Sequence, residues 1–572
     1  MFLKRTAAAL AVFLFASGTA FADVPRGKVL GELMRVLDLP LKTGRSFVDV
    51  DETTPYGPAL DSALSLGILY PADDFSPEII CTNAETLMFA LQAMGFRHEA
   101  EISRWALPPE DERLPQYISG YVALAKSVTP AAPADVTASP WGSTTEEQLE
   151  EVLEWAEECR ENIVWNREIR RPEGTLTIHR EKVGRPPQGW RVMLGIYDTA
   201  EKATAAAEKV HASVPFTVIP LDTSYAVASP LAADRSEAWK IARSTGRHDF
   251  SATILPESGE SEALFWVSFT PADNGDAVIR GSHAGSGWKL KKLSAIAAGS
   301  NALAAINGGY FSSAGPIGTL FSDGQPMTLP YYNRSMAAWN SKGRLCFSGG
   351  EFRTRLQIND GPWITVLLNS LGGVGQTSIL TASMGKSQSR AGNNGTVARV
   401  HDGLVQEAVP ALMYNRDMDD GDWLIVTRDP DVTIRRGDRV RLKNEWREQP
   451  PFEVGTAVQA GPLLYAPGRQ YWDEMINEKV ITMRHPRTLI GQKGKKMVWL
   501  VVDGRSSWHS QGLSLEEAAD LGRRLGLTAL LNLDGGGSSE MWWDGNVVNR
   551  VSDGRERSMP YGIMVLKKTA SE

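Results

Sequence analysis

Two apolar runs near the C-terminal end of the chain stop at aspartates that are followed by glycine. The first run, Met497–Val502, leads into Asp503-Gly504-Arg505, and the second, Leu527–Leu533, leads into Asp534 and three glycines. Apolar runs of this length that end at glycine are typical of buried strands. Because open sheets place their ligands at strand ends, we expect the two aspartates to belong to one site.

A helix is predicted between the two runs, and short strands dominate the chain before them. Ser514 and Glu517 form a capping-box pattern, and Gly526 ends the predicted helix Ser514–Leu525. Strand-like stretches separated by glycine and asparagine begin near Phe250, among them Leu264–Phe269, Trp363–Leu368 and Trp423–Thr427. The pattern predicts a large β-rich α+β domain over residues 250–568.

The residue types at these strand ends suit phosphate ester chemistry. The consecutive glycines Gly535–Gly537 allow successive backbone N–H groups to turn toward one anion. Arg487 and Arg505 are permanently charged, fork-shaped donors for phosphate oxygens. Glycosidic cleavage usually needs two carboxylates, and Asp503 and Asp534 are the obvious pair. Each Asp-Gly alone is also a common turn, so the prediction depends on the joint pattern.

An ordered set of short motifs extends from Asn307 to Ser539. The motifs are Asn307-Gly308-Gly309-Tyr310-Phe311, Gly461-Pro462, Pro486-Arg487-Thr488, Asp503-Gly504-Arg505, the helix start Leu515-Glu516-Glu517-Ala518-Ala519, and Asn532-Leu533-Asp534-Gly535-Gly536-Gly537-Ser538-Ser539. The set resembles the phosphodiester glycosidase family. The resemblance implies hydrolysis of a sugar-1-phosphodiester, which frees a sugar and leaves a phosphomonoester on the acceptor.

The resemblance also assigns roles to residues of this chain. It implies a catalytic set of polar residues, namely Asn307, Arg487, Asp503, Arg505 and Asp534. It implies a substrate-binding set that shapes the anion pocket, namely Gly308, Gly309, Gly504, Gly535, Gly536, Gly537, Ser538 and Arg557. Which aspartate is the acid and which the nucleophile is left open by the motif.

A histidine follows the first aspartate motif at a point where the family commonly has small residues. His509 is a candidate auxiliary acid or base, and a plain polar contact is the alternative. No ligand spacing of the calcium or zinc type appears, so we expect no metal and no cofactor.

The first 22 residues have the pattern of a secretory signal. Lys4 and Arg5 precede an apolar run over 7–15, and the small-residue pattern Ala20-Phe21-Ala22 follows. We expect cleavage after Ala22 and export to the periplasm or cell surface. A membrane anchor is the alternative, although the apolar run is short for a bilayer and no second run follows.

Residues 28–127 have helical apolar spacing and predict a small all-α module. Its turn at Phe47, its loop Phe75-Ser76-Pro77 and its helix start Thr82-Asn83-Ala84-Glu85 resemble an S-layer-homology repeat. The resemblance implies binding to an anionic wall polymer. The family uses an arginine at the position of Asn83, so the fold is expected here and the binding is left open.

A linker, a connector and a small domain are expected before the C-terminal domain. Residues 128–142 are rich in proline and alanine, and 143–185 begin with an acidic amphipathic helix. Residues 186–248 alternate strands with helices and predict a small α/β sandwich. This spacing resembles the sporulation-related repeat (SPOR) domain, which implies binding to peptidoglycan. A ferredoxin-like module that only connects its neighbours is the alternative.

Charge and cysteine content limit the possible partners. The net charge of -8 over 572 residues is mild, and the absence of a dense Lys/Arg stripe makes nucleic acid an unlikely partner. Cys81, Cys159 and Cys346 are an odd number without metal-type spacing. The sequence therefore predicts an exported multi-domain hydrolase that cleaves a sugar-1-phosphodiester in an envelope or capsular glycan and is held near the wall by its N-terminal modules. The alternatives are a catalytically silent glycan-binding scaffold and a phosphodiesterase that cleaves at phosphorus.

Overall fold

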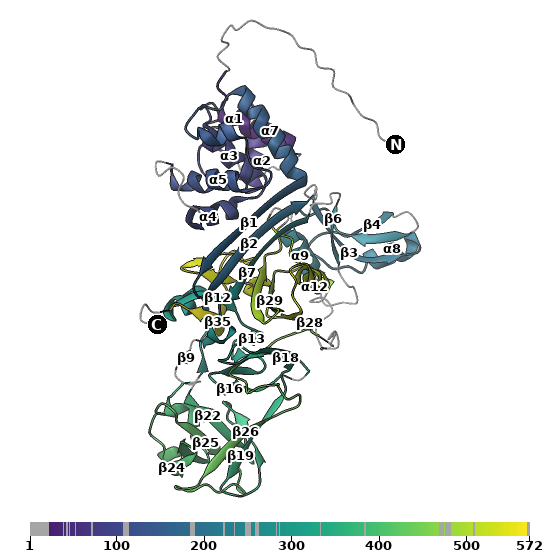
Figure 1. Ribbon diagram of the computed structural model, residues 1–572. Helices are drawn as coiled ribbons and strands as arrows, with labels where there is room; N and C mark the ends of the chain where they lie inside the picture. Colours follow the sequence, from purple (N-terminus) through teal and green to yellow (C-terminus); the bar gives the residue numbers. More distant parts are fainter. Residues whose placement is uncertain are drawn as a thin grey trace. The chain divides into compact units, whose positions relative to one another are not determined.

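The computed structural model describes residues 22–568 apart from isolated residues and short stretches, the longest of which are 107–113, 184–188, 246–252, 258–261, 468–473 and 475–481. The chain divides into two compact units, Met1–Cys159 and Arg160–Glu572 (Figure 1). The expected signal sequence, residues 1–22, lies outside the described residues except for Ala22. Within the described ranges, no helix is both long and apolar enough to cross a membrane.

The first unit is built from helices. The expected capping box is confirmed, because the Thr82 hydroxyl accepts from the Glu85 N–H at 3.3 Å and the Glu85 carboxylate accepts from the Thr82 N–H at 3.0 Å. The helices are α1 (Arg26–Val36), α2 (Gly57–Ser65), α3 (Asn83–Ala93), α4 (Arg97–Ala106), α5 (Gln116–Ser127), α6 (Ala134–Ala138) and α7 (Glu146–Glu161), the last of which runs past the end of the unit.

The Asn83 side chain is buried in the first unit and forms hydrogen bonds there. Its side chain is 1% exposed, donates to the Ser139 carbonyl at 3.0 Å and accepts from the Thr144 hydroxyl at 3.0 Å. A buried amide with both ends hydrogen-bonded stabilises the packing of its own unit. The position where S-layer-homology repeats carry a recognition arginine therefore has a structural role in this chain.

The segment expected to be a linker, residues 128–142, is folded. It contains α6, and its apolar side chains Ala132 and Val136 are buried. The carbonyl of Pro130 accepts from the Trp155 indole N–H of α7 at 3.0 Å. Alanine and proline composition gives the pattern of a linker, but burial of these few apolar side chains fixes the segment on its unit.

The connector expected over 143–185 becomes part of a large sheet. After α7 the chain forms a hairpin whose alternating residues Ile163, Trp165, Leu176 and Ile178 are fully buried. The sheet order is β1-β2-β7-β30-β29-β31-β28. These strands are β1 (Asn162–Arg171), β2 (Gly174–Val183), β7 (Glu262–Pro271), β30 (Lys496–Val502), β29 (Arg487–Lys493), β31 (Ala529–Asn532) and β28 (Leu463–Tyr465).

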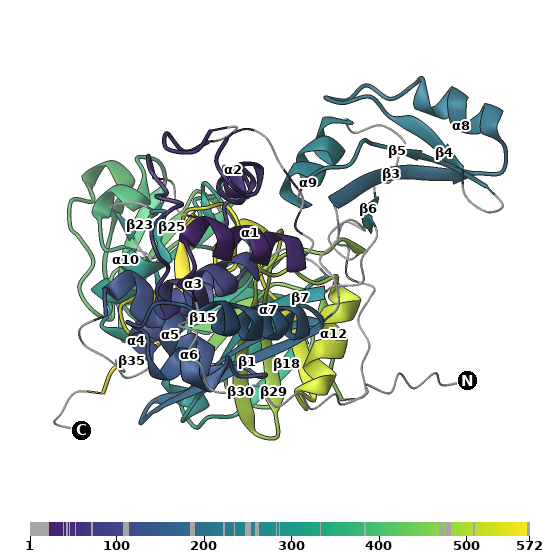
Figure 2. The ribbon, with the colours of Figure 1, turned by 90° about the horizontal axis from the view of Figure 1, so that it is seen from above.

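The small α/β part extends beyond the expected boundary at residue 248. Its sheet has the order β4-β5-β3-β6, and α8 contacts β4 and β5 while α9 contacts β3 (Figure 2). The last strand lies in the region expected to start the C-terminal domain, but it pairs with β3 from Gly189 to Met193 and so covers the free edge of that strand. The elements are β3 (Gly189–Tyr197), α8 (Ala200–Ala207), β4 (Thr217–Pro220), β5 (Tyr225–Ala228), α9 (Arg235–Ser244) and β6 (Thr253–Glu257).

A second sheet packs against the large one. Phe269 of β7 contacts Trp499 of β30 at 5.1 Å and Trp543 of β32 at 5.7 Å between ring centroids, so aromatic rings join the two layers. The second sheet has the order β33-β32-β12-β35-β8, with α10 (Leu293–Gly299) packed on it. Its strands are β33 (Asn546–Val547), β32 (Met541–Trp543), β12 (Ala302–Asn307), β35 (Tyr561–Leu566) and β8 (Ala277–Gly281).

The expected helix between the two aspartate motifs is confirmed as α12 (Leu515–Arg524). Ser514 and Glu517 form its capping box, with the Glu517 N–H donating to the Ser514 hydroxyl at 3.1 Å. Leu515, Ala518 and Leu521 face the large sheet in a buried apolar cluster. The helix therefore fixes the chain between the first aspartate and the second.

Smaller sheets complete the β-rich part. One has the order β16-β15-β27-β17-β18, one β20-β19-β26 and one β21-β22-β25-β23-β24. The expected run Trp363–Leu368 gives two short strands, β20 and β21, in different sheets, because Val366 between them turns into the core.

These strands are β15 (Leu320–Ser322), β16 (Gln325–Thr328), β17 (Ser335–Trp339), β18 (Leu345–Gly349), β19 (Phe352–Ile358), β20 (Ile364–Thr365), β21 (Leu367–Leu368), β22 (Thr377–Thr381), β23 (Thr396–His401), β24 (Leu404–Pro410), β25 (Trp423–Thr427), β26 (Val440–Trp446) and β27 (Thr456–Gln459). Two-stranded pieces are β9 (His283–Ala284) with β10 (Gly287–Trp288), β11 (Lys291–Lys292) with β34 (Ser558–Met559), and β13 (Phe311–Ser312) with β14 (Gly315–Pro316). Short 3₁₀ turns are η1 (Asn274–Asp276), η3 (Gln388–Ala391), η4 (Ala411–Met413) and η5 (Gly536–Ser538).

Candidate active site

The strand ends bring the sequence motifs together. β29 is antiparallel to both β30 and β31, so its first residue, Arg487, pairs with Val502, and Leu489 pairs with Asn532. The start of one strand thus lies beside the ends of its two neighbours. β12 of the second sheet ends at Asn307, and the Asp534 N–H donates to the next carbonyl, Gly308, at 3.4 Å. The motifs that contain Asn307, Arg487, Asp503 and Asp534 therefore meet at these strand ends.

Asn307 holds the converging loops. Its side chain is 1% exposed, and its Nδ2 donates to the Asp534 carbonyl at 2.8 Å. Its Oδ1 accepts from the Thr488 hydroxyl at 2.7 Å and from the Glu540 N–H at 3.1 Å. With both ends bonded to the protein, this predicted catalytic residue acts in the structure as a brace between the two sheets.

Asp534 occupies a different environment. It is partly buried, and its carboxylate accepts from the Gly535 N–H at 3.0 Å. Burial raises the pKa of the Asp534 carboxyl, while the Ser538 hydroxyl and the charge of Arg557 oppose the rise. A carboxyl with a raised pKa beside two hydrogen-bonding groups is suited to proton transfer.

Some of the backbone N–H groups after Asp534 are hydrogen-bonded within the protein. The N–H of Gly536 donates to the Pro486 carbonyl at 2.9 Å, and that of Ser538 donates to the Gly535 carbonyl at 3.2 Å. A Cβ on Gly536 would stand 2.8 Å from Nη2 of Arg505, and one on Gly537 would stand 2.2 Å from Nη2 of Arg557. Glycine is needed because two guanidinium groups lie directly against this backbone.

Arg505 and Arg557 are the accessible cations of the site. Arg505 has the left-handed φ of 64° and donates to the Ser552 hydroxyl at 3.2 Å. Arg557 donates to the Ser538 hydroxyl at 3.2 Å and pairs with Asp553 at 2.7 Å. Asp553 also lies 3.5 Å from Nη1 of Arg505, so one carboxylate fixes two guanidinium groups. The side chains of Arg505 and Arg557 are 19% and 40% exposed, so both guanidinium groups reach the surface of the site.

Arg487 differs from these two. Its side chain is 2% exposed, its Nε donates to the Leu513 carbonyl at 2.8 Å and its Nη2 donates to the Met483 carbonyl at 2.8 Å. Burial lowers the pKa of this guanidinium to about 10. Backbone carbonyls accept from the Arg487 guanidinium that was expected to bind phosphate. This is because Arg487 is the first residue of β29 and is buried.

Asp503 is enclosed by donors. Its carboxylate, 1% exposed, accepts from Nδ2 of Asn549 at 2.8 Å and from the Arg550 N–H at 2.7 Å. Nε2 of His509 lies 2.7 Å from Oδ2 of Asp503, and the imidazole packs on Phe265 at 4.6 Å between ring centroids. His509 thus makes a polar contact to the first aspartate.

Gly504 owes its place to close backbone packing. A Cβ there would stand 2.7 Å from the Pro486 nitrogen and 2.9 Å from the Gly512 Cα. Gly308 and Gly309 are similar, since a Cβ on Gly308 would lie 2.2 Å from the Tyr561 ring and one on Gly309 would lie 2.6 Å from the Gln459 carbonyl. These three predicted substrate-binding glycines let the strand ends approach one another.

Three site residues carried no assigned role in the sequence prediction. Tyr310 donates to the Gly461 carbonyl at 2.8 Å, and burial followed by the charge of Asp534 raises its pKa to about 12. The Arg334 guanidinium carbon lies 4.6 Å from the centroid of the Tyr310 ring. The Tyr561 phenol oxygen accepts from the Gly309 N–H at 2.7 Å. Tyr310 belongs to the motif Asn307–Phe311, whereas Arg334 and Tyr561 belong to none of the sequence motifs.

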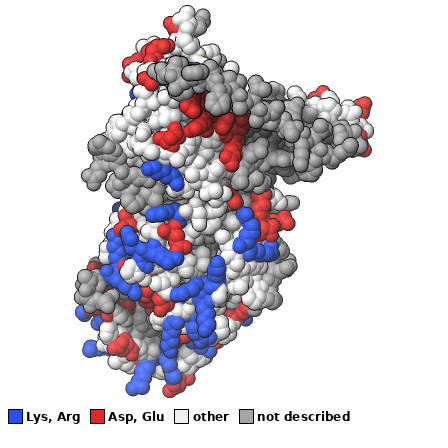
Figure 3. Space-filling view, turned by 45° about the horizontal axis from the view of Figure 1, so that its top comes forward, with Lys and Arg blue, Asp and Glu red and all other residues white. Residues whose placement is uncertain are grey.

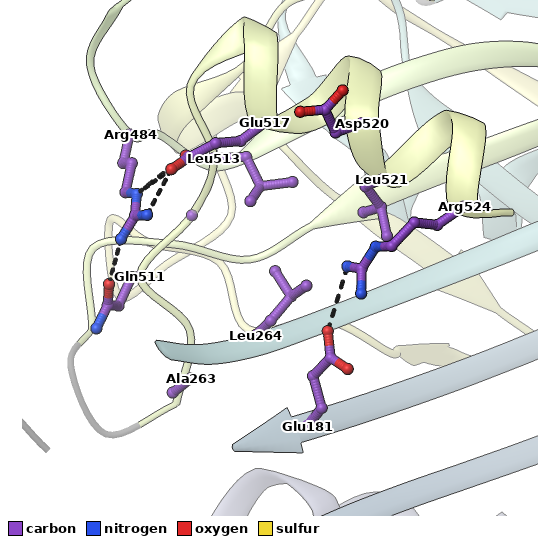
Figure 4. A pocket seen from close by; sticks show the side chains of 11 residues that line it. Glu181, Ala263, Leu264, Arg484, Gln511, Leu513, Glu517, Asp520, Leu521 and Arg524 are labelled. Atoms are coloured by element: carbon purple, nitrogen blue, oxygen red, sulfur yellow. Dashed lines mark hydrogen bonds and ion pairs between the residues drawn. The ribbon is translucent and has the colours of Figure 1, made fainter. Parts of the chain in front are cut away.

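A cavity of about 430 Å³ lies between α12 and the neighbouring part of the sheet, at β2 and β7 (Figure 4). In the figure Arg484 points to Glu517 and Gln511, and Arg524 points to Glu181; the Arg484 Nε lies 2.8 Å from Oε1 of Glu517. The lining residues are Glu181, Ala263, Leu264, Arg484, Gln511, Gly512, Leu513, Glu517, Asp520, Leu521 and Arg524.

The cavity is separated from the cationic pair by backbone. Gly512, which lines it, packs on Gly504, but Arg505, Asp534 and Arg557 do not line it. In the ranges that the structure describes, no group of three or more His, Cys, Asp and Glu side chains is arranged to hold a metal ion.

Comparison with known proteins gives one family match. The model of the phosphodiester glycosidase family matches residues 387–566, a range that includes Arg487, Asp503, Arg505, Asp534 and Arg557. An uncharacterized SPbeta prophage-derived protein of Bacillus subtilis, YomE, is 38% identical over 80 residues, which are 14% of this chain and 12% of that protein. The chain thus spans much less than two thirds of that relative.

One solved structure shares the fold at low identity, and a second is less similar. A protein of Burkholderia pseudomallei described as exported is 20% identical, with a TM-score of 0.51 over 71% of this chain and 97% of that one. The catalytic domain of zebrafish N-acetylglucosamine-1-phosphodiester alpha-N-acetylglucosaminidase, auto-inhibited by its pro-peptide, is 12% identical, with a TM-score of 0.30 over 66% of this chain and 89% of that one. On sequence, residues 387–566 match the phosphodiester glycosidase family.

Proposed function

We propose that the second unit hydrolyses the glycosidic bond of a sugar-1-phosphodiester. The observation that carries the proposal is the pair Arg505 and Arg557, held by Asp553 against the glycine backbone beside Asp534. This arrangement offers two fixed cations and one carboxyl of raised pKa to a phosphodiester. The family match over 387–566 supports the same reaction class.

The reaction breaks the bond between the anomeric carbon and the bridging oxygen. Water adds to the anomeric carbon and loses one proton to the solvent, while the bridging oxygen leaves with the phosphate and becomes more negative as the bond breaks. Arg505 and Arg557 stabilise that developing charge, and Asp534 in its protonated form gives its proton to the leaving oxygen and regains one from solvent. Asp503 lies among donors, so its role in this scheme is to hold His509 and the chain at Asn549 and Arg550.

We further propose that the chain works outside the cytoplasm, near the cell wall. The signal pattern over residues 1–22 supports export, and the resemblance of 28–127 and 186–248 to wall-binding modules supports the location. Cell fractionation of the full chain tests export, and co-sedimentation of the mature chain with purified peptidoglycan tests wall binding. Recovery only from the cytoplasm, or no co-sedimentation, would contradict the respective proposal.

Product analysis distinguishes this reaction from cleavage at phosphorus. The full chain is incubated with the methyl phosphodiester of N-acetylglucosamine-1-phosphate in water enriched in heavy oxygen. We expect the label in the released sugar, since water attacks carbon. Label in the phosphate would instead show a phosphodiesterase, and no turnover of this ester or of UDP-N-acetylglucosamine would favour a binding scaffold.

A matched pair of variants locates the reaction. Arg505→Ala is expected to lower kcat/KM by about 100-fold, as loss of one preorganised donor does. Arg523→Ala removes the same charge from an α12 side chain that is 53% exposed, and it is expected to keep the wild-type rate. Equal rates for both variants would exclude the proposed anion site.

A further inference from the structure

One face of the small sheet β20-β19-β26 carries a row of basic side chains. Alternate residues of β19 and β26 point to opposite faces, and Phe352, Leu356 and Val440 lie in the core. The opposite face carries Arg353 and Arg355 of β19. Its other cations belong to the segment of β26 and the residue before it, namely Arg439, Arg441 and Lys443. We call these five residues the basic face.

The basic face has more cations than its neighbours neutralise. Glu445 pairs with Arg355 at 2.9 Å and with Lys443 at 2.6 Å, and Asp360 pairs with Arg441 at 2.9 Å. Among the described residues, two carboxylates therefore form ion pairs with this set of five cations. In Figure 3 blue side chains gather in columns on the lower part of the second unit, the part that holds β19 and β26 in Figure 1. The local excess is positive although the whole chain has a net charge of -8.

A chain of contacts leads from the residue that follows β26 to the candidate active site. Arg447, just after β26, pairs with Glu351 at 3.1 Å, and Glu351 accepts from the Asn333 N–H at 2.7 Å. The next residue, Arg334, lies over the ring of Tyr310. The residues after β26 thus lead toward Tyr310, whose pKa is raised by burial and then by the charge of Asp534.

The length of this row indicates a long ligand. Residues on one face of a strand recur every two positions, or roughly 6.6 Å, so the row from Arg439 to Lys443 spans roughly 13 Å. Arg353 and Arg355 widen the row on the neighbouring strand, so the basic face is larger than one phosphate group. A ligand that uses the whole row has repeated negative charges, and fork-shaped guanidinium groups suit phosphate oxygens.

We propose that the substrate is a polyanionic glycan with repeated phosphodiester links, which binds along the basic face while one link occupies the candidate active site. The inference rests on the proposed function, because it names the substrate class of that same site. Binding of single-stranded nucleic acid relies on rows of stacking rings, whereas among the described residues of this face Trp363 is the ring, covered by Lys443 at 4.4 Å. Charge without base stacking favours the phosphodiester polymer.

Binding of long-chain inorganic polyphosphate to the full chain tests the proposal. Affinity is measured by calorimetry at several salt concentrations for wild type and for Arg353→Ser with Arg441→Ser. We expect the double variant to bind about 10-fold or more weakly and to lose about 1 to 2 from the slope of log affinity against log salt. The control, Arg170→Ser with Arg171→Ser, removes the same charge from exposed residues at the tip of the β1–β2 hairpin and is expected to bind as wild type.

A second double variant, Arg439→Ser with Lys443→Ser, is expected to show the same loss, with the fold of each protein checked by circular dichroism. Unchanged affinity in both double variants would overturn the inference. A single-stranded DNA that binds as tightly as polyphosphate and is lost in the same variants would overturn it in favour of nucleic acid.

Turnover of the small methyl phosphodiester by wild type is measured in parallel, so that the two proposals fail separately. If wild type hydrolyses the small ester but the double variants bind polyphosphate as wild type does, the proposed function stands and this inference is overturned. Sensitive binding without turnover of the small esters overturns the proposed function and, with it, the assignment of the polymer as substrate.

Discussion

The two aspartate motifs have the same local sequence plan and opposite environments. Asp503 follows β30 and meets Asn549, Arg550 and His509, which surround its carboxylate at 2.7–2.8 Å. Asp534 follows β31 and meets Ser538 and Arg557 in a site with partly exposed cations. The comparison teaches that an aspartate at a strand end is a brace when the protein supplies all of its donors, and a candidate for reaction when it does not.

The largest expected effect is that of Asp503→Asn on folding. The amide nitrogen would set a donor against Asn549, Arg550 or His509, and a buried donor without an acceptor is costly. We expect the free energy of unfolding of the second unit to fall by on the order of 3 kcal/mol, measured by urea denaturation with tryptophan fluorescence. Wild-type stability with complete loss of turnover would give Asp503 a chemical role and break the comparison.

Asp534→Asn is expected to act on turnover. The amide cannot transfer a proton, so kcat should fall by about 100- to 1,000-fold. Because burial raises the pKa of Asp534, the neutral amide is expected to leave stability within about 1 kcal/mol of wild type. Asp402→Asn, at a side chain 93% exposed, is the control. An Asp534→Asn enzyme with normal turnover would remove this residue from the reaction.

Glu540 sharpens the comparison as a third carboxyl near the same loop. Its side chain is fully buried beside Glu556, and burial followed by the Glu556 carboxylate raises its pKa to about 9. The folded protein therefore holds a proton that the unfolded chain loses near pH 4.5, so this group lowers stability as pH rises toward 9.

We expect Glu540→Gln to remove that loss of stability. The free energy of unfolding should rise by up to ~3 kcal/mol at pH 7, and the gain should vanish below pH 4. Melting temperatures of both proteins from pH 4 to 9 measure it. Parallel pH profiles for wild type and variant would show that Glu540 titrates normally in the folded protein.

The smallest expected effect is that of Gly536→Ala. The residue has a φ of 62°, and its new Cβ would stand 2.8 Å from Nη2 of Arg505. We expect a loss of about 1 kcal/mol in stability and a fall in kcat/KM of about 10-fold as the guanidinium moves. Gly545 is also at positive φ but has open space around its Cβ, so Gly545→Ala should lower stability without changing kcat/KM. Equal kinetics for the two variants would separate Arg505 from the reaction.

Local pattern determined several elements of this protein. The capping boxes at Thr82 and Ser514 depend on residues three apart, and both are present in the structure. The alternation of strands and helices after Gly189, the strand Trp423–Thr427 and the strand before Asp503 depend on short apolar periods. These features could be predicted because their interactions lie within one element or between adjacent ones.

Tertiary structure alone decided the rest. The connector over 162–183 joins the large sheet, and β6 joins the sheet of β3, because strand edges take partners that no local pattern names. The roles of the polar residues followed the same rule. Asp503 and Asn549 are 46 positions apart and Asn307 and Asp534 are 227 apart, so hydrogen bonds formed only in the fold made Asp503 and Asn307 braces. The same fold left Asp534 beside partly exposed guanidinium groups.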